Sequence, residues 1–60
     1  MRIFKLTPEG RRKLKIPSQR REPVLDYLYD NNTATLDELE AIDKDARAKL
    51  RQHKGLVEEI

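Results

Sequence analysis

Basic residues recur every three or four positions in the last third of the chain, namely Lys44, Arg47, Arg51 and Lys54. At about 100° per residue, Arg47, Arg51 and Lys54 would fall on one face of a helix, with Lys44 close by. Ala46, Leu50 and His53 would fall on another face, which could pack against the rest of the protein. Guanidinium and ammonium groups arranged in this way can contact phosphate oxygens and guanine edges. Cations near a helix C-terminus can also do no more than offset the helix macrodipole, so both interpretations stand.

A second group of basic residues lies nearer the N-terminus and comprises Arg11, Arg12, Lys13, Arg20 and Arg21. Residues 1–22 hold eight basic and two acidic residues, and residues 23–43 hold six acidic residues and no lysine or arginine. Residues 44–60 hold five basic and three acidic residues, so the net charge of +2 hides a strong segregation. These blocks could be solvated faces that stabilise one another, or they could supply a basic surface that neutralises phosphates.

Side chains for covalent or acid–base catalysis are scarce. His53 is the only histidine, Ser18 is the only serine and cysteine is absent, so no nucleophile can be paired with a base. The carboxylates between Asp37 and Asp45 lack the glycine and the final glutamate of a calcium loop. With only two glycines, the chain has no phosphate-cradling loop. We expect no enzymatic activity, no metal site and no cofactor, and we expect His53 to be a packing or capping residue.

The length of 60 residues allows a single small domain, residues 1–60, with no room for a deep catalytic cleft. Charged residues make up 40% of the chain, but leucine, isoleucine and valine recur at helical spacing, which favours a folded domain over disorder. No apolar run approaches the roughly 20 residues of a membrane span, and no signal-peptide core follows the N-terminus. Because the absence of cysteine also suits a reducing compartment, we expect a cytoplasmic protein without a membrane partner.

The N-terminal elements can be predicted from alternation and capping signals. Residues 2–6 alternate and predict a short strand with Phe4 and Leu6 on one face. Thr7-Pro8-Glu9 is typical of a helix start, but the glycine that follows weakens the pattern, so residues 8–15 are either a short helix or a turn.

A first long helix is predicted from about Ser18 to Asp30. Pro23 is tolerated in its first turn if the helix starts near Arg20 to Glu22. Its apolar stripe comprises Val24, Leu25 and Leu28. Tyr27 and Tyr29 lie two positions apart on this helix and cannot both face inward, so one of them is expected at an exposed surface. Residues 30–33 then predict a turn.

Two further helices and a strand complete the pattern. Thr35 and Glu38 form a capping box for a helix of about two turns, with Ala34 and Leu39 at the hydrophobic staple positions. The buried residues of this helix are expected to be Leu36, Leu39 and either Ile42 or Ala41. Asp43 is a candidate N-cap for a third helix over residues 44–54, which would end at Gly55 in a left-handed conformation. Residues 56–60 predict a second strand.

Two short helices joined by a tight turn, the second of them basic, match a helix-turn-helix. The sequence resembles winged helix-turn-helix proteins, which are common among archaeal and bacterial transcription regulators. Three parts of the chain carry the resemblance: Arg21-x-x-Val24-Leu25-x-x-Leu28, Ala34-Thr35-Leu36-Asp37-Glu38-Leu39, and Leu50 with Lys54-Gly55-Leu56-Val57-Glu58-Glu59. The opening segment Leu6-Thr7-Pro8-Glu9-Gly10 is similar to one that such domains carry after their wing, and to one in the winged-helix region of archaeal phenylalanyl-tRNA synthetase α chains. The resemblance implies a scaffold helix, a second helix, a recognition helix and a wing strand.

The sequence departs from the winged-helix pattern in two ways. The Leu6–Gly10 segment precedes the first helix instead of following a wing, so the ribbon must pair the two chain ends. The spacing from Leu39 to Leu50 is also short for a second helix, a turn and a recognition helix. We therefore expect a mainly α, α+β fold: a reduced winged helix with a three-helix core and a small two-stranded ribbon joining the chain ends.

The expected function is binding of nucleic acid, in particular double-stranded DNA, with transcription regulation as the implied role. Residues 44–54 would face the groove and the N-terminal basic group would straddle the backbone. RNA remains open as the partner, because no feature of the sequence separates it from DNA. The alternative is a protein-interaction or homodimerisation module, in which an exposed tyrosine anchors the interface and acidic and basic blocks meet.

Overall fold

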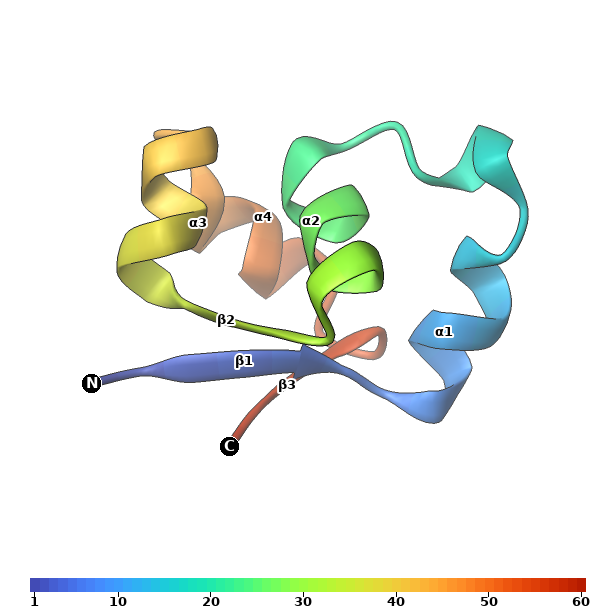
Figure 1. Ribbon diagram of the computed structural model, residues 1–60, viewed down its shortest axis with the longest axis horizontal. Helices are drawn as coiled ribbons and strands as arrows, with labels where there is room; N and C mark the ends of the chain where they lie inside the picture. The colour runs from blue at the N-terminus through green and yellow to red at the C-terminus, as the bar shows by residue number, and fades with distance from the viewer.

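The computed structural model describes all 60 residues and contains four α-helices, one 3₁₀ turn and a three-stranded antiparallel sheet (Figure 1). In chain order the elements are β1 (Ile3–Leu6), α1 (Pro8–Leu14), the 3₁₀ turn η1 (Pro17–Gln19), α2 (Pro23–Asn31), β2 (Thr33–Thr35), α3 (Leu36–Ile42), α4 (Ala46–Gln52) and β3 (Val57–Glu59). The expected α+β class is therefore confirmed. No helix of this fold has both the length and the apolar character needed to cross a bilayer.

The sheet has the order β2-β1-β3, so the N-terminal strand is its centre. Leu6 lies opposite Val57, and Lys5 lies opposite Glu58, which confirms that the two ends of the chain pair with each other. The ribbon was predicted with two strands, and this was wrong because Thr33–Thr35 pairs with the other edge of β1. A segment of three residues is too short to show alternation, and its partner lies some thirty residues away, so only the fold reveals it.

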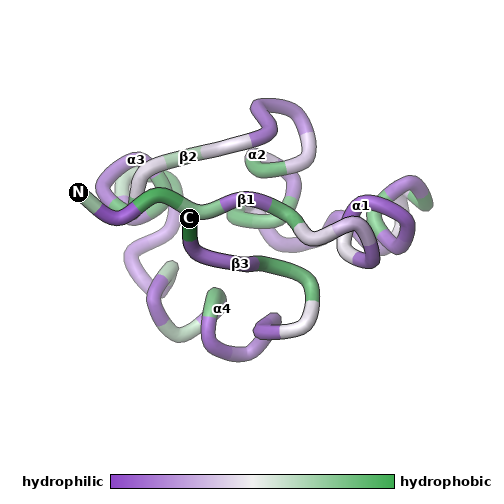
Figure 2. The backbone as a smooth tube through the Cα atoms, turned by 90° about the horizontal axis from the view of Figure 1, so that it is seen from below, coloured by the Kyte–Doolittle hydropathy of each residue, from purple (hydrophilic) through white to green (hydrophobic).

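The molecule has two layers, with the sheet on one side and α2, α3 and α4 on the other. Figure 2 shows the sheet nearest the viewer with these helices behind it and α1 beyond one end. Phe4 and Leu6 point inward from the central strand and are buried. The core comprises Phe4, Leu6, Leu14, Val24, Leu25, Leu28, Ala34, Leu36, Leu39, Ala46 and Val57. Lys5 and Glu58 form an ion pair on the opposite, exposed face, at 3.3 Å.

Residues 8–14 form a helix, which settles the choice that the sequence left open between helix and turn. The side chain of Thr7 accepts a hydrogen bond from the backbone N–H of Gly10, and Pro8 occupies the first turn. Gly10 is itself needed, because a Cβ at this position would lie within 3.0 Å of the carbonyl carbon of Leu56 and closer still to its oxygen. The glycine therefore allows α1 to press against the turn that follows α4.

The helix predicted from Ser18 begins at Pro23 instead. Proline disfavours the helical conformation in the residue before it, and Glu22 is accordingly extended, with φ −89° and ψ 131°. Residues 17–19 form only the short turn η1. At its other end, α2 is followed by Asn32, which has a positive φ of 69°. Gly55 has no positive φ, so the prediction of a left-handed glycine there was wrong.

The capping box of α3 is confirmed, since Thr35 accepts from the N–H of Glu38 and Glu38 accepts from the N–H of Thr35. The helix buries Leu36 and Leu39, but Ala41 and Ile42 are both exposed, contrary to expectation. 

The helix predicted over residues 44–54 is α4, and it is shorter than predicted, covering Ala46–Gln52. Asp43 ends α3 with an extended backbone and accepts a hydrogen bond from the N–H of Asp45 at 2.9 Å. It therefore caps the turn between the helices, and Asp45 becomes the N-cap of α4. His53 is the C-cap residue, as the capping interpretation expected.

Candidate nucleic-acid interface

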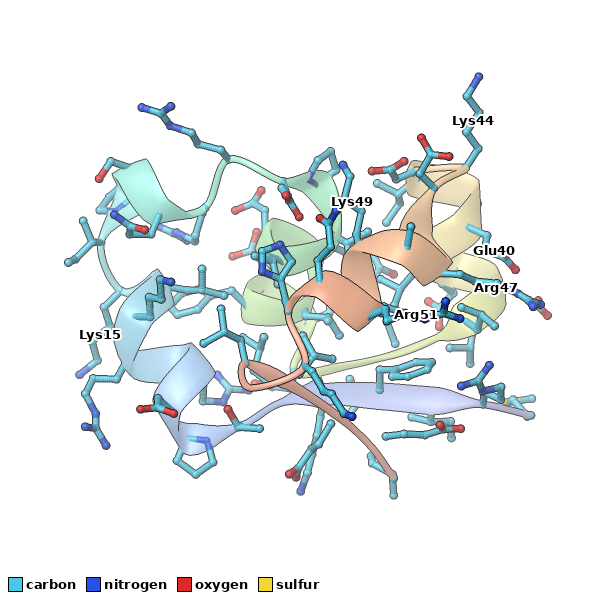
Figure 3. All side chains as sticks on the ribbon, turned by 180° about the vertical axis from the view of Figure 1, so that it is seen from behind. Lys15, Glu40, Lys44, Arg47, Lys49 and Arg51 are labelled. Carbon is cyan, nitrogen blue, oxygen red and sulfur yellow. The ribbon has the colours of Figure 1, made fainter.

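The helix α4 has one side packed against the core and one side exposed to solvent. Ala46 is fully buried and Leu50 is half-buried against the core, whereas Arg47 and Arg51 are exposed. This is the separation that the helical spacing predicted. In Figure 3, Arg47 and Arg51 lie on the side of α4 above the sheet, whereas Lys44 points away from the sheet. Lys44 is therefore not brought together with the other predicted residues of this helix.

A hollow of about 510 Å³ lies between α4 and the inner face of the β1–β3 ribbon. Its lining combines four cations, one carboxylate and four apolar side chains: Arg2, Arg47, Arg51, Lys54, Glu59, Phe4, Leu36, Leu50 and Val57. Arg51 and Lys54 form no ion pair with any carboxylate of the protein. The sequence singled out three of the four cations and missed Arg2, which the fold brings to the site from the opposite end of the chain.

Arg2 is held in place by two neighbours. Its Nε and Nη2 donate to the two carboxylate oxygens of Glu59 at 3.0 and 3.1 Å, and its guanidinium stands over the ring of Phe4 at 5.3 Å. These hydrogen bonds lower the pKa of Glu59 and raise the pKa of Arg2, so the pair stays fully ionised near neutral pH. The alternation of Arg2, Phe4 and Leu6 in the predicted strand was the one signal that could have placed Arg2 on the inward face.

The remaining cations of this region are engaged to different degrees. Arg47 donates to Glu40 at 3.3 Å, but two thirds of its side chain is exposed, and Figure 3 shows the two side chains together beside α3. Lys49 donates to Asp43 at 3.1 Å. The N–H of Asp45 and the ammonium of Lys49 lower the pKa of Asp43, which keeps that carboxylate ionised. Arg47 therefore remains available at the surface, whereas Lys49 is part of the connection between α3 and α4.

The cations of α1 lie apart from this hollow, and Figure 3 shows Lys15 at the far end of the molecule from Arg47. Arg11 donates to the side chain of Asn32, while Arg12 and Lys13 are exposed and form no ion pair. Lys13 and Arg21 line a second hollow of about 350 Å³ that reaches the end of α4. There His53 contacts Glu22, with 2.7 Å between Nε2 and Oε2.

Arg20 differs from the other predicted binding residues because its guanidinium is built into the fold. It stands 4.6 Å from the centre of the Tyr29 ring and lies 3.9 and 4.0 Å from Asp26 and Asp30. Its side chain is 23% exposed, and its Nε is buried without a hydrogen-bond partner. Arg20 therefore contributes to packing first, and its charge is already balanced by α2.

The two tyrosines of α2 are both half-buried against the core, so the expectation that one would stand exposed was wrong. Tyr29 packs under Arg20, and the hydroxyl of Tyr27 donates to Glu38 at 2.9 Å. This hydrogen bond raises the pKa of Tyr27, while the N–H of Thr35, followed by Tyr27, lowers the pKa of Glu38.

No group of three or more histidine, cysteine, aspartate or glutamate side chains is placed so that it could hold a metal ion. No protein-family model matches the chain. Comparison with curated proteins and with solved structures likewise gives no match. The function must therefore be inferred from the arrangement of the residues themselves.

Proposed function

We propose that this protein is a small nucleic-acid-binding module that binds double-stranded DNA through the exposed side of α4. The observation that carries the proposal is that Arg47 and Arg51 face solvent on this side, while Ala46 anchors the opposite side in the core. A helix held in this way can approach a groove without losing its packing. Lys13 and Arg21 reach the end of the same helix and would contact the flanking phosphates.

The state of the acidic residues supports this proposal. Most carboxylates of residues 22–43 already have partners: Glu22 contacts His53, Asp26 and Asp30 face Arg20, Glu38 accepts from Tyr27 and Thr35, Glu40 faces Arg47, and Asp43 faces Lys49. The unpaired charges that remain are mainly positive and lie on α1, at Arg21, at Lys44 and at the end of α4. A surface with this balance favours phosphate over a carboxylate-rich partner.

We further propose that the fold is a reduced winged helix in which α2 is the scaffold, α3 the second helix and α4 the recognition helix. In this scheme β3 is the wing strand and β1 supplies its partner from the other end of the chain. The order α2-β2-α3-α4-β3, with β1 between β2 and β3, supports this correspondence. It also accounts for the position of the Leu6–Gly10 segment, which begins with the last residue of β1, the strand that completes the ribbon.

The test is the affinity for a labelled DNA duplex, measured by fluorescence anisotropy at rising salt concentration, for the wild type and for the double variant Arg47→Ala/Arg51→Ala. We expect the double variant to bind at least about tenfold more weakly and to show a salt slope smaller by about 2. Its thermal stability should be nearly unchanged, because the exposed Arg47–Glu40 pair contributes about 0–1 kcal/mol and Arg51 has no partner.

Two results would count against the proposal. One is a wild type that does not bind the duplex at low salt, particularly if its hydrodynamic radius rises with protein concentration, as expected for self-association. The other is a double variant that unfolds at a much lower temperature, which would show that these arginines serve the fold.

A further inference from the structure

The hollow between α4 and the ribbon has a composition suited to one particular ligand group. Its floor is apolar, from Phe4, Leu50 and Val57, and its rim carries the unpaired cations Arg51 and Lys54. A charged group held at such a rim is partly shielded from water, which strengthens its attraction to the cations. Glu59 is the only carboxylate in the lining, and an ionised carboxylate there would repel an anion.

The geometry around Glu59 removes that repulsion. Arg2 engages both carboxylate oxygens in a two-pronged contact, so the net charge of this pair is zero. The ring of Phe4 lies under the guanidinium and fixes its position. Without Arg2, the freed carboxylate would remain in the hollow and could pair with one of the neighbouring cations of α4.

We propose that this hollow holds one phosphodiester group of the nucleic-acid backbone, bound by Arg51 and Lys54, and that Arg2 acts as a positioning residue that neutralises Glu59. This inference rests on the proposed function and assigns a site to it. Arg2 does not contact the phosphate in this arrangement. Its effect on binding therefore depends on whether Glu59 is present.

The test is a double-mutant cycle with Arg2→Met, Glu59→Gln and the combined variant, using the same labelled duplex. We expect Arg2→Met to weaken binding by about tenfold, because it exposes a negative charge beside the phosphate. The combined variant should regain the wild-type affinity within about twofold, since the charge to be neutralised is gone. Equal losses in Arg2→Met and in the combined variant would show that Arg2 contacts the nucleic acid directly and would overturn its assignment.

A matched control comes from the same two strands. Lys5 and Glu58 form an ion pair on the outer face of the β1–β3 ribbon, at 3.3 Å. The variants Lys5→Met and Lys5→Met/Glu58→Gln change the same charges but lie on the opposite face from the hollow. We expect each to bind DNA within about twofold of the wild type, and a loss equal to that of Arg2→Met would show that only overall charge matters.

The phosphate itself is tested with Arg51→Ala/Lys54→Ala, for which the slope of log affinity against log salt should fall by about 2. A slope that falls by only about 1, as expected if Arg51 alone contacts a phosphate, would overturn the site in the hollow while leaving the proposed function in place. A wild type that does not bind would overturn both. Thermal melting of every variant separates these outcomes from loss of the fold.

Discussion

The two basic regions of this protein differ in what surrounds their charges. The helix α1 carries Arg11, Arg12 and Lys13 at consecutive positions, so their side chains leave the helix in different directions. On α4, Arg47 and Arg51 lie four positions apart on one side, Lys54 follows just beyond the end of the helix, and strands from both chain ends lie beside them. Charge density along the sequence is thus higher in α1, but α1 contributes only Lys13 to the hollow at the end of α4. Arg47 and Arg51 of α4, by contrast, line the hollow beside the ribbon together with Lys54 and Arg2. We therefore expect the spacing of the charges on a packed helix to matter more for binding than their number.

The two regions are nevertheless joined through the turn that follows α4. The N–H of Thr7 donates to the carbonyl of Leu56 at 2.9 Å, its hydroxyl donates to the carbonyl of Gly55 at 3.0 Å, and Gly10 packs against the same turn. These contacts form a junction between the start of α1 and the turn after α4. Any substitution that breaks this junction should therefore disturb both α1 and the end of α4.

The largest effect is expected for Gly10→Ala at this junction. The added Cβ would collide with the backbone of Leu56, so we expect a loss of about 2–3 kcal/mol in the free energy of unfolding, measured by urea denaturation. Gly55→Ala is the matched control, because nothing lies within 4 Å of a Cβ there and its φ is not positive. Its stability should stay within about 1 kcal/mol of the wild type. Equal losses in both variants would show that the close approach of α1 to this turn does not matter.

The contribution of the two basic regions to DNA affinity is compared with Arg12→Ala/Lys13→Ala on α1 and Arg47→Ala/Arg51→Ala on α4, both in the anisotropy assay. Each pair removes two positive charges. We expect the α1 variant to bind about threefold more weakly, against at least about tenfold for the α4 variant. A greater loss of affinity in the α1 variant would reverse the assignment and make α1 the main contact with DNA.

A smaller effect on stability should distinguish Arg20, whose side chain packs within the fold, from Arg21, which is exposed at the surface. Arg20→Met removes a guanidinium that stands over Tyr29 and faces two carboxylates, so we expect it to lower the free energy of unfolding by about 1 kcal/mol. Arg21→Met, at an exposed position, should change stability by less than about 0.5 kcal/mol but weaken DNA binding slightly. The opposite ranking in calorimetry would mean that the Tyr29 contact adds nothing.

The smallest effect is expected on the melting temperature when the pH is lowered. Hydrogen bonds lower the pKa values of Glu38, Asp43 and Glu59 in the folded state. A group with a lowered pKa contributes stability above its unfolded pKa and loses it as the pH falls through the folded value. The melting temperature should therefore be level near neutral pH and fall below about pH 4. Glu38→Gln should lower the melting temperature at pH 7 and reduce this dependence, and an unchanged acid response in that variant would contradict the role of Glu38.

The parts of the fold that the sequence predicts correctly depend on short-range signals. The caps at Thr7 and Thr35 act within three residues, so they can be recognised without knowing the tertiary structure. The β1–β3 ribbon was predicted because the first and last segments were the strand-like ones and because the Leu6–Gly10 segment precedes the first helix. The strand β2 was not, because Thr33–Thr35 becomes a strand only through its pairing with β1.

The prediction of the site was limited for the same reason. Helical spacing was enough to place Arg47 and Arg51 on one side of α4, but not to show that Lys44 points away from them or that Arg20 packs on Tyr29. The hollow depends on Arg2 and Glu59, from the two ends of the chain, lying on the face of the ribbon beside α4, and no local pattern encodes such a long-range contact.

The central claim is that α4 and the hollow beside it form the DNA-binding surface, and amide chemical shifts test it most directly. A ¹⁵N-labelled protein would be titrated with unlabelled duplex DNA at low and at moderate salt. We expect the largest shifts in residues 47–54 and at the β1–β3 ribbon near Arg2, with an affinity that falls steeply as salt rises. Shifts confined to α1, or no shifts at low salt, would contradict the claim.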